Sequence, residues 1–313
     1  MFFQFAALAL VPRPPPRSVG VIGGGIAGLA CARRLEQLGL EVTIFDTGKR
    51  GPGGRASSRM WRGRPVDHAV QSVASTPGSA FHDYLTELEA VGVVKQWSGL
   101  GVLDESGFKP DRQSNPRYVG VGGMGAIADE LARGLDIRQD TWVSPNGGIY
   151  TKRGTHGWCV RESKQVERQF DAVVIAHNGK CAERLTSKID ARDVHMLLRA
   201  RFATAATGGG PGGGRMTLNS MYSLLVELPA GVMPSAGERG GVDGAYVEHE
   251  PALRYLGSND AKHGHTGESE VWTVLSSGAF GKSHKVRVGQ QQPRVEPSHT
   301  EIPPHTIPCR GVP

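Results

Sequence analysis

The sequence predicts an α/β protein that begins with a glycine-rich crossover between two parallel strands and ends in a smaller domain with an antiparallel sheet. Residues 19–22 form an apolar run typical of a strand buried on both faces. Residues 26–38 place apolar side chains at helical spacing, and residues 41–45 form a second strand. Short apolar segments then recur within residues 220–277, as expected for strands of an antiparallel sheet.

Three glycines between the first strand and the helix follow the spacing GxGxxG. Gly23 permits a tight turn, Gly25 lets the main chain approach a pyrophosphate, and Gly28 lets the helix pack close to the strands. The first amides of the helix, including those of Ile26 and Ala27, lack intrahelical partners and carry partial positive charge. This pattern predicts that the turn binds the diphosphate of a dinucleotide.

Asp46, at the end of the second strand, supports the same interpretation. A carboxylate about 20 residues after the glycines can accept hydrogen bonds from ribose hydroxyls. In a chain with 44 glycines the spacing alone is weak evidence. The order of strand, glycines, helix, strand and acid is much stronger, and the alternative is a βαβ turn with a structural role only.

A second glycine pair, Gly53 and Gly54, stands in a loop rich in glycine and arginine, with Arg55 directly after it. The glycines allow close approach of the main chain, and the guanidinium can donate two parallel hydrogen bonds to phosphate oxygens. We therefore expect this loop to contact the same ligand. The alternative is a solvated basic loop.

The net charge of +6 raises the question of nucleic-acid binding. Neither an aromatic-rich strand nor a recognition helix accompanies the densest basic cluster, so we predict no nucleic-acid partner. Arginines close to a pyrophosphate explain part of the charge. The cluster consists of Arg50, Arg55, Arg59, Arg62 and Arg64.

Composition also limits the class of protein, its compartment and its cysteine chemistry. Mean hydropathy is −0.29, and no apolar run approaches the length of a membrane span, so we expect no transmembrane segment. Residues 1–17 are predicted to be a disordered leader, which leaves the compartment open between cytoplasm and plastid. The four cysteines form no CxxC pair and have no histidine at metal-binding spacing, which predicts reduced thiols and no metal site.

The remaining elements predict two domains. Their order is typical of a two-domain flavoprotein of the glutathione-reductase type. Residues 18–180 are expected to form the FAD-binding domain, and the assignment of residues 76–116 to this domain or to the substrate domain is left open. The elements expected in this part are a helix over 78–94, two strands over 93–108, a helix over 126–135, a strand over 137–143 and a return strand over 169–176.

Residues 181–286 are predicted to form the smaller α+β substrate domain, with a flexible glycine-rich insertion over 205–216. Residues 287–313 have few apolar side chains and many prolines, which predicts disorder. The elements expected in the substrate domain are a helix over 182–198 and strands over 220–228, 245–256 and 271–277.

Segments across residues 18–286 resemble the renalase-like FAD/NAD(P)-binding amine oxidoreductase family, part of the flavin amine oxidase superfamily, and especially its plant and algal branch. The N-terminal motifs are shared by many flavin amine oxidases, and the later ones are more specific to this branch. The segments are VGVIGGGIAGLACARRLEQLG, GGRASSR, VDHAVQ, GGMGAIADELARGL, FDAVVIAHNGKCAERL, DGAYVEHEPALRYLGSNDAKHG and EVWTVLSSGAFGKSHKV.

The resemblance implies bound FAD and a small-molecule substrate. It places the diphosphate at residues 23–28 with Arg55, and the ribose at Asp46. It also places residues 53–54 against the pyrophosphate or the flavin edge, and the adenine against the main chain of Val143. Family members oxidise an amine or a dihydronicotinamide such as NAD(P)H by hydride transfer to the flavin, which oxygen usually reoxidises.

No catalytic residue is assigned. His177 and Lys180 are ionisable and close to the expected cofactor strand, but a structural role for the histidine and a surface position for the lysine are favoured. Trp272 and Tyr255 are expected in the core rather than in an aromatic pocket.

Two departures from the family pattern bear on activity. After Val286 the chain lacks the glycine-aspartate turn and last helix of the family, which predicts a C-terminally truncated chain, and VDHAVQ lacks a glycine that the family carries. The leading hypothesis is an FAD-dependent oxidoreductase, and the alternative is a non-catalytic dinucleotide-binding fragment. A carotenoid-desaturase-like flavoprotein is disfavoured because no long apolar membrane-docking segment is present.

Overall fold

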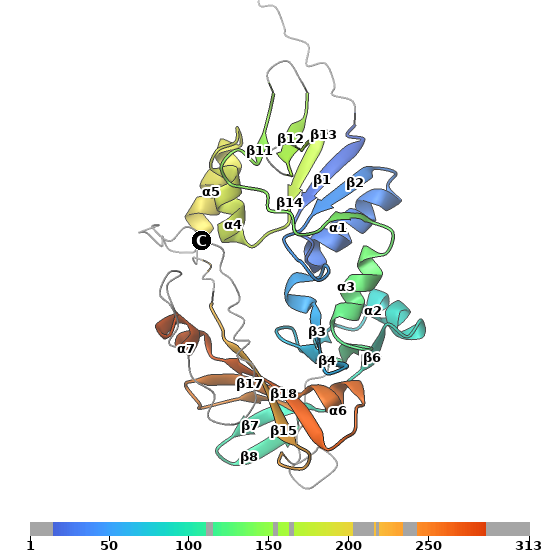
Figure 1. Cartoon of the computed structure of the whole chain (residues 1–313), viewed down its shortest axis with the longest axis vertical. Coiled ribbons are helices and arrows are strands. Elements are labelled where there is room, and N and C mark those ends of the chain that lie inside the picture. The colour runs from blue at the N-terminus through green and yellow to red at the C-terminus, as the bar shows by residue number, and fades with distance from the viewer. Residues whose placement is uncertain are drawn as a thin grey trace, which may run out of the picture.

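The computed structural model describes residues 15–110, 115–152, 156–162, 166–202, 216, 219–233 and 243–285. Most of the predicted leader, nearly all of the glycine-rich insertion and the predicted C-terminal tail lie outside these residues. Figure 1 shows two lobes, with the β3–β4 hairpin between them. The hairpin is formed by β3 (Ser58–Trp61) and β4 (Arg64–Asp67).

The first lobe contains a four-stranded parallel sheet in the order β10-β2-β1-β14. Its central pair is joined by one helix, as the glycine crossover predicts. The elements are β1 (Ser18–Ile22), α1 (Ile26–Gln37), β2 (Glu41–Phe45), β10 (Asp136–Arg138) and β14 (Ala172–Ile175).

The register of this sheet brings three chain segments to one edge. Ile22 at the end of β1 is paired with Phe45 of β2 and with Ile175 of β14. The residues that follow these strands therefore emerge side by side at the carboxyl ends of parallel strands, which is where α/β sheets bind ligands.

A three-stranded antiparallel meander leads into the return strand. Its last strand ends at Phe170, whose ring packs edge-on against Phe45 with 5.8 Å between centroids. Two helices follow β14. These elements are β11 (Ile149–Tyr150), β12 (Trp158–Arg161), β13 (Glu167–Phe170), α4 (Gly179–Thr186) and α5 (Arg192–Phe202).

Between the lobes lie a small sheet, β5-β9-β6, and two helices. One of them, α3 (Gly125–Ala132), begins in a glycine-rich turn and packs on α1. The other elements are β5 (Val73–Ala74), α2 (Ala80–Ala90), β6 (Val94–Gln96) and β9 (Arg117–Gly120).

The second lobe is a six-stranded sheet in the order β15-β18-β17-β16-β7-β8. Neighbouring strands are antiparallel except for the parallel pair of β7 and β16. The elements are β7 (Leu100–Asp104), β8 (Gly107–Pro110), β15 (Ser223–Pro229), β16 (Gly244–Val247), β17 (Leu253–Ser258), α6 (Asn259–His263), β18 (Ser269–Ser276) and α7 (Gly278–Ser283).

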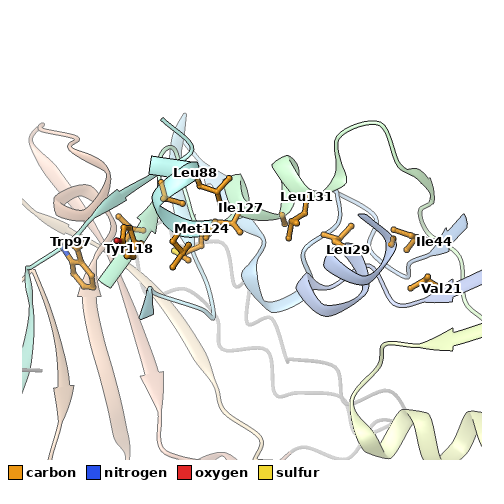
Figure 2. Packing of buried hydrophobic residues seen from close by; sticks show 14 of the residues in the cluster. Val21, Leu29, Ile44, Leu88, Trp97, Tyr118, Met124, Ile127 and Leu131 are labelled. Atoms are coloured by element: carbon orange, nitrogen blue, oxygen red, sulfur yellow. The ribbon is translucent and has the colours of Figure 1, made fainter. Parts of the chain in front are cut away.

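One hydrophobic core connects the parts. Figure 2 shows it running from the crossover through α3 to the small sheet. Tyr255 of β17 belongs to the same cluster, so the core reaches the six-stranded sheet. Labelled residues in Figure 2 are Val21, Leu29, Ile44, Leu88, Trp97, Tyr118, Met124, Ile127 and Leu131.

Some predicted elements were wrong in extent. The strand expected over 137–143 is limited to β10, because Asp140 adopts φ 50° and turns the chain. The strand expected over 245–256 is a pair, β16 and β17, and His249 between them has φ 63°. The segment 93–108 contributes three strands rather than two, and the helix over 182–198 is divided into α4 and α5.

Across the described residues, the helices are too short or too polar to cross a membrane.

Candidate dinucleotide site

The crossover is a closely packed turn. The amide of Gly23 donates to the Phe45 carbonyl at 2.9 Å, and its φ of 112° is accessible to glycine. A Cβ at Gly28 would lie 1.9 Å from the carbonyl oxygen of Gly23, so a side chain there would collide with the main chain. Both glycines are therefore required by the fold itself.

Gly25 differs from these neighbours. Among the described residues, no heavy atom lies within 4 Å of the position that its Cβ would occupy. Its φ of −75° is also accessible to other residues. The missing side chain of Gly25 thus leaves open space, and the fold does not need that space. A ligand that lies against the main chain would need it.

Gly25 is also the N-cap of α1, so the open space lies at a helix N-terminus. The amides of Ile26 and Ala27 fall in the first turn, where no intrahelical carbonyl is available to them. The first turn holds no acidic side chain. First-turn amides without intrahelical partners and the positive end of the helix dipole therefore lie at this space, which suits an anion such as a diphosphate.

Asp46 lies across the turn. Its Oδ1 accepts a hydrogen bond from the amide of Gly24 at 3.2 Å, and the residue is 8% exposed. Its carbonyl accepts a hydrogen bond from Thr141 at 2.8 Å. The carboxylate is thus held at the same strand edge as the glycines, as its predicted role with a ribose requires.

The second glycine loop lies directly against the first. Gly25 and Gly53 form a parallel bridge, and the amide of Gly53 donates to the Gly24 carbonyl at 2.7 Å. Gly53 has φ 106°, and a Cβ there would lie 2.8 Å from the Cβ of Ala128. Gly54 has φ 57° and lies beside Gly25, and the Arg55 side chain is exposed. Folding therefore brings the two predicted loops together.

Val143 lies in a loop instead of a strand. It is 5% exposed and packs in a cluster with Phe45 and Ile149 behind the crossover sheet. The contact of its main chain with an adenine stays a prediction.

His177 follows the return strand, next to Gly23. Burial lowers the pKa of its imidazole, and the nearby Asp46 carboxylate opposes that shift. Trp272 and Tyr255 are each 3% exposed, in line with the core positions expected for them. Lys180 is half-buried at the start of α4.

Two arginines of the basic cluster do not face the crossover. Arg64 Nη2 lies 2.6 Å from Glu227 Oε1 of β15, and its Nη1 lies 3.3 Å from Asp260 Oδ1 of α6. Arg62 pairs with the same glutamate at 3.3 Å. These two positive charges are explained by acidic partners in the second lobe, so the pyrophosphate explanation is wrong for them.

Sequence reasoning missed a buried polar cluster centred on Asp67. Lys262 and His263 of α6 both contact its carboxylate, and all three side chains are 0% exposed. The signal was present in two segments of the resemblance, VDHAVQ and SNDAKHG, whose polar residues had no assigned role.

A separate hollow lies away from the crossover. It has a volume of about 660 Å³ and is lined mainly by α3 and the segments around Gly92 and Ile137. Its lining does not include the glycines at 23–28, and the crossover has the better-defined chemistry.

The residues at the crossover fit a dinucleotide. The open position at Gly25, the free amides of α1 and a fixed carboxylate at Asp46 are the three features that a pyrophosphate and its ribose require. An acidic residue at this position suits a free ribose hydroxyl better than a phosphorylated one.

Comparisons with known proteins agree with this site. A family model described as an NAD(P)-binding Rossmann-like domain matches residues 21–88. The chain is 26% identical over 264 residues, 75% of its length, to the tRNA 5-methylaminomethyl-2-thiouridine biosynthesis bifunctional protein MnmC of Thiobacillus denitrificans. It is 35% identical over 79 residues, 24% of its length, to the lysine-specific histone demethylase 1 homolog 1 of Oryza sativa subsp. japonica. The chain spans 41% of the first relative and 9% of the second.

Solved structures share the whole architecture at low sequence identity. Wild-type putrescine oxidase bound to putrescine superposes with a TM-score of 0.59 at 12% identity, covering 85% of this chain and 77% of that chain. Reduced UDP-galactopyranose mutase gives 0.61 at 10% identity, covering 85% and 76%. An oxidoreductase from Methanosarcina mazei gives 0.57 at 14%, covering 83% and 78%. The chain therefore contains an NAD(P)-binding Rossmann-like domain over residues 21–88, and it shares its mixed α/β fold with these solved proteins.

Proposed function

We propose that the protein is an FAD-dependent oxidoreductase in which a hydride passes from an amine or a dihydronicotinamide-type substrate to the flavin, with reoxidation by oxygen. The observation that carries the proposal is the open space at Gly25, in a turn where Gly23, Gly24 and Gly28 are all closely packed. A fold that needed only a tight turn would have no reason to keep this position empty beside unpaired helix amides.

The chain's own residues bind and orient the cofactor in this proposal. The amides around Gly25 and the Arg55 guanidinium hold the diphosphate, Asp46 holds the adenosine ribose, and the main chain of Val143 meets the adenine. Gly53 and Gly54 give the main chain close access to the pyrophosphate or the flavin edge. A bound FAD supplies the redox chemistry, since its oxidised form accepts a hydride and its reduced form returns electrons to oxygen.

An amine substrate is supported by the names of similar proteins. Putrescine is a diamine, a lysine demethylase acts on a methylated amine, and a methylaminomethyl group contains an amine nitrogen next to carbon. Each of these three names refers to a compound or group that contains a carbon bonded to an amine nitrogen. This common feature favours an amine over other hydride donors.

The alternative is a non-catalytic protein that binds the ADP half of a dinucleotide and turns nothing over. It is supported by the extent of the family match, which covers only residues 21–88 and describes dinucleotide binding alone.

The test is flavin binding by the whole chain. FAD and ADP are titrated separately, with absorbance and fluorescence of the flavin and calorimetry for ADP as readouts. The FAD-bound protein is then mixed without oxygen with putrescine, a methylated lysine peptide or NADPH. Bleaching of the flavin band by one of them supports the proposal, and FAD binding without bleaching by any amine or dihydronicotinamide supports the alternative.

The Gly25→Ala variant is the matched control. Its added methyl group enters the open space, so we expect FAD and ADP to bind at least ten-fold more weakly while the protein stays folded. Equal binding by the wild type and the variant would show that a ligand does not use this turn.

A further inference from the structure

Asp67 connects the second lobe to the segments between the lobes through opposite sides of one carboxylate. Its Oδ1 faces β3 and α3, where it accepts hydrogen bonds from Ser58 Oγ at 2.6 Å and from the Met124 amide at 2.8 Å. Met124 is the N-cap of α3, so the carboxylate also meets the positive end of that helix.

The other oxygen faces the second lobe. Asp67 Oδ2 lies 3.0 Å from Lys262 Nζ and 2.9 Å from His263 Nε2, both on α6. The lysine also donates to Gln71 Oε1 at 2.7 Å. The second lobe therefore holds one oxygen and the segments between the lobes hold the other, and a displacement of either part would break hydrogen bonds on its own side.

The main chain of Asp67 is held in the same way. Its amide donates to Asn259 Oδ1 at 2.9 Å, and its carbonyl accepts from Thr273 Oγ1 at 2.8 Å. Gln71 Nε2 donates to the same carbonyl at 2.7 Å. Residues of α6 and β18 thus fix the backbone of β4 as well as its side chain.

Burying this ion pair is costly. Burial opposes ionisation of Asp67, but the hydrogen bond from His263 and the charge of Lys262 outweigh it and hold the pKa of the carboxyl well below its usual range. Burial lowers the pKa of Lys262, and Asp67 opposes that shift. Apolar side chains of similar volume often stabilise a junction at least as well as a buried ion pair. The polar cluster is therefore better explained by a need for fixed geometry.

The cluster is adjacent to the second glycine loop. The turn Gly54–Ala56 leads directly into β3, and the amide of Val70, just after β4, donates back to the Arg55 carbonyl at 3.1 Å. A ligand that extends from Gly25 along residues 53–55 would therefore reach the segment anchored by Asp67. The described hydrogen bond between Gly24 and Asp46, at the ADP end, shares no residue with the hydrogen bonds of the Asp67 carboxylate.

We propose that Asp67 is a positioning residue that fixes the second lobe against the Gly53–Arg55 loop and thereby determines how the flavin end of the cofactor is held. The ADP end stays unaffected, because the bridge between Gly25 and Gly53 holds the diphosphate-binding loop to the crossover without Asp67. This inference rests on the proposed function.

The test compares ADP with FAD in the Lys262→Met variant, which keeps the buried volume but removes one partner of Asp67. We expect ADP affinity to stay within about two-fold of the wild type, FAD affinity to fall at least ten-fold, and the visible spectrum of bound flavin to shift. Lys109→Met is the matched control. Lys109 also pairs with an aspartate, Asp104, in the six-stranded sheet of the second lobe, but its side chain is 59% exposed. It should change neither affinity nor spectrum.

If Lys262→Met does not fold, His263→Ala decides the question, since it removes a single hydrogen bond to the same oxygen at the end of α6. We expect a loss of about three-fold or more in FAD affinity with unchanged ADP affinity. Equal weakening of both ligands would indicate a general loss of structure and overturn the inference, as would a folded variant with wild-type FAD binding and spectrum. A wild-type chain that binds ADP but not FAD would overturn the proposed function, and the inference with it.

Discussion

Lys262 Nζ lies 3.0 Å from Asp67 Oδ2, and neither side chain has any exposed surface. The two residues, one on α6 and the other on β4, are 195 positions apart in sequence. The ion pair is one side of a junction in which a single carboxylate joins the second lobe to the segments between the lobes.

Removal of the two partners should have unequal effects on stability. Breaking a buried ion pair costs about 3–5 kcal/mol because one charge is left unpaired. Lys262→Met leaves Asp67 with hydrogen bonds from Ser58, Met124 and His263, whereas Asp67→Asn leaves the ammonium group without a carboxylate. We expect Asp67→Asn to lower the free energy of unfolding more, as measured by urea denaturation. An equal or larger loss in Lys262→Met would show that the lysine is the more important partner.

The crossover glycines should separate packing from ligand binding. In Gly28→Ala the new Cβ would lie 1.9 Å from the Gly23 carbonyl oxygen, so we expect a loss of about 1–3 kcal/mol or more from overpacking. In Gly25→Ala the new atom enters open space, and the free energy of unfolding should change by less than about 1 kcal/mol. Thermal unfolding of both variants without ligand checks the contrast. A similar loss in both would mean that residue 25 is packed after all.

Two neighbouring arginines should differ in their contribution to the lobe junction. Arg64 is 18% exposed and bonds to Glu227 and Asp260, so Arg64→Met should cost about 1.5–3 kcal/mol. Arg62 is 63% exposed, pairs with Glu227 and lies 5.5 Å from the centroid of the Trp61 ring, so Arg62→Met should cost less than about 1 kcal/mol. Urea denaturation of the two variants provides the comparison. Equal effects would show that proximity to Glu227, rather than burial, determines the energy.

Stability should fall under mildly acidic conditions. Burial lowers the pKa of both His68 and His177 in the folded chain, with the charge of Arg59 adding to the shift at His68. The unfolded chain therefore takes up protons first, at about pH 6.5, and the free energy of unfolding decreases as the pH falls through that value toward the lowered pKa.

This pH dependence is measured by urea denaturation between pH 7.5 and pH 5.5. A His68→Gln/His177→Gln double variant should show a shallower slope than the wild type. His265→Gln, at an exposed position, is the control. An unchanged slope in the double variant would assign the effect to other groups.

Much of the crossover could be predicted from the sequence because its signals are local. The strands, helix, glycines and Asp46 all lie within residues 18–46, and each has a periodic or steric reason. The proximity of Gly25 and Gly53 was expected only through a shared ligand, since no local rule joins two loops across β2.

The junction could not be predicted in this way. Asp67 and Lys262 are ordinary polar residues within their own segments, and only tertiary packing shows that both are buried. The end of the predicted strand over 137–143 was missed for a similar reason. Asp140 leaves β geometry to let Thr141 bond to Asp46, a contact that the alternation of apolar residues does not encode.

The parallel pairing of β7 with β16 has a consequence for synthesis of the chain. β7 ends at Asp104, and its partner begins at Gly244, so about 140 residues must be translated before that edge is covered. At 5–20 residues per second, the β7–β8 hairpin waits roughly 7–30 seconds with an open edge. During this interval the nascent polypeptide presents an uncovered strand to other molecules, and recruitment of a chaperone to ribosomes carrying this stretch would be its observable trace.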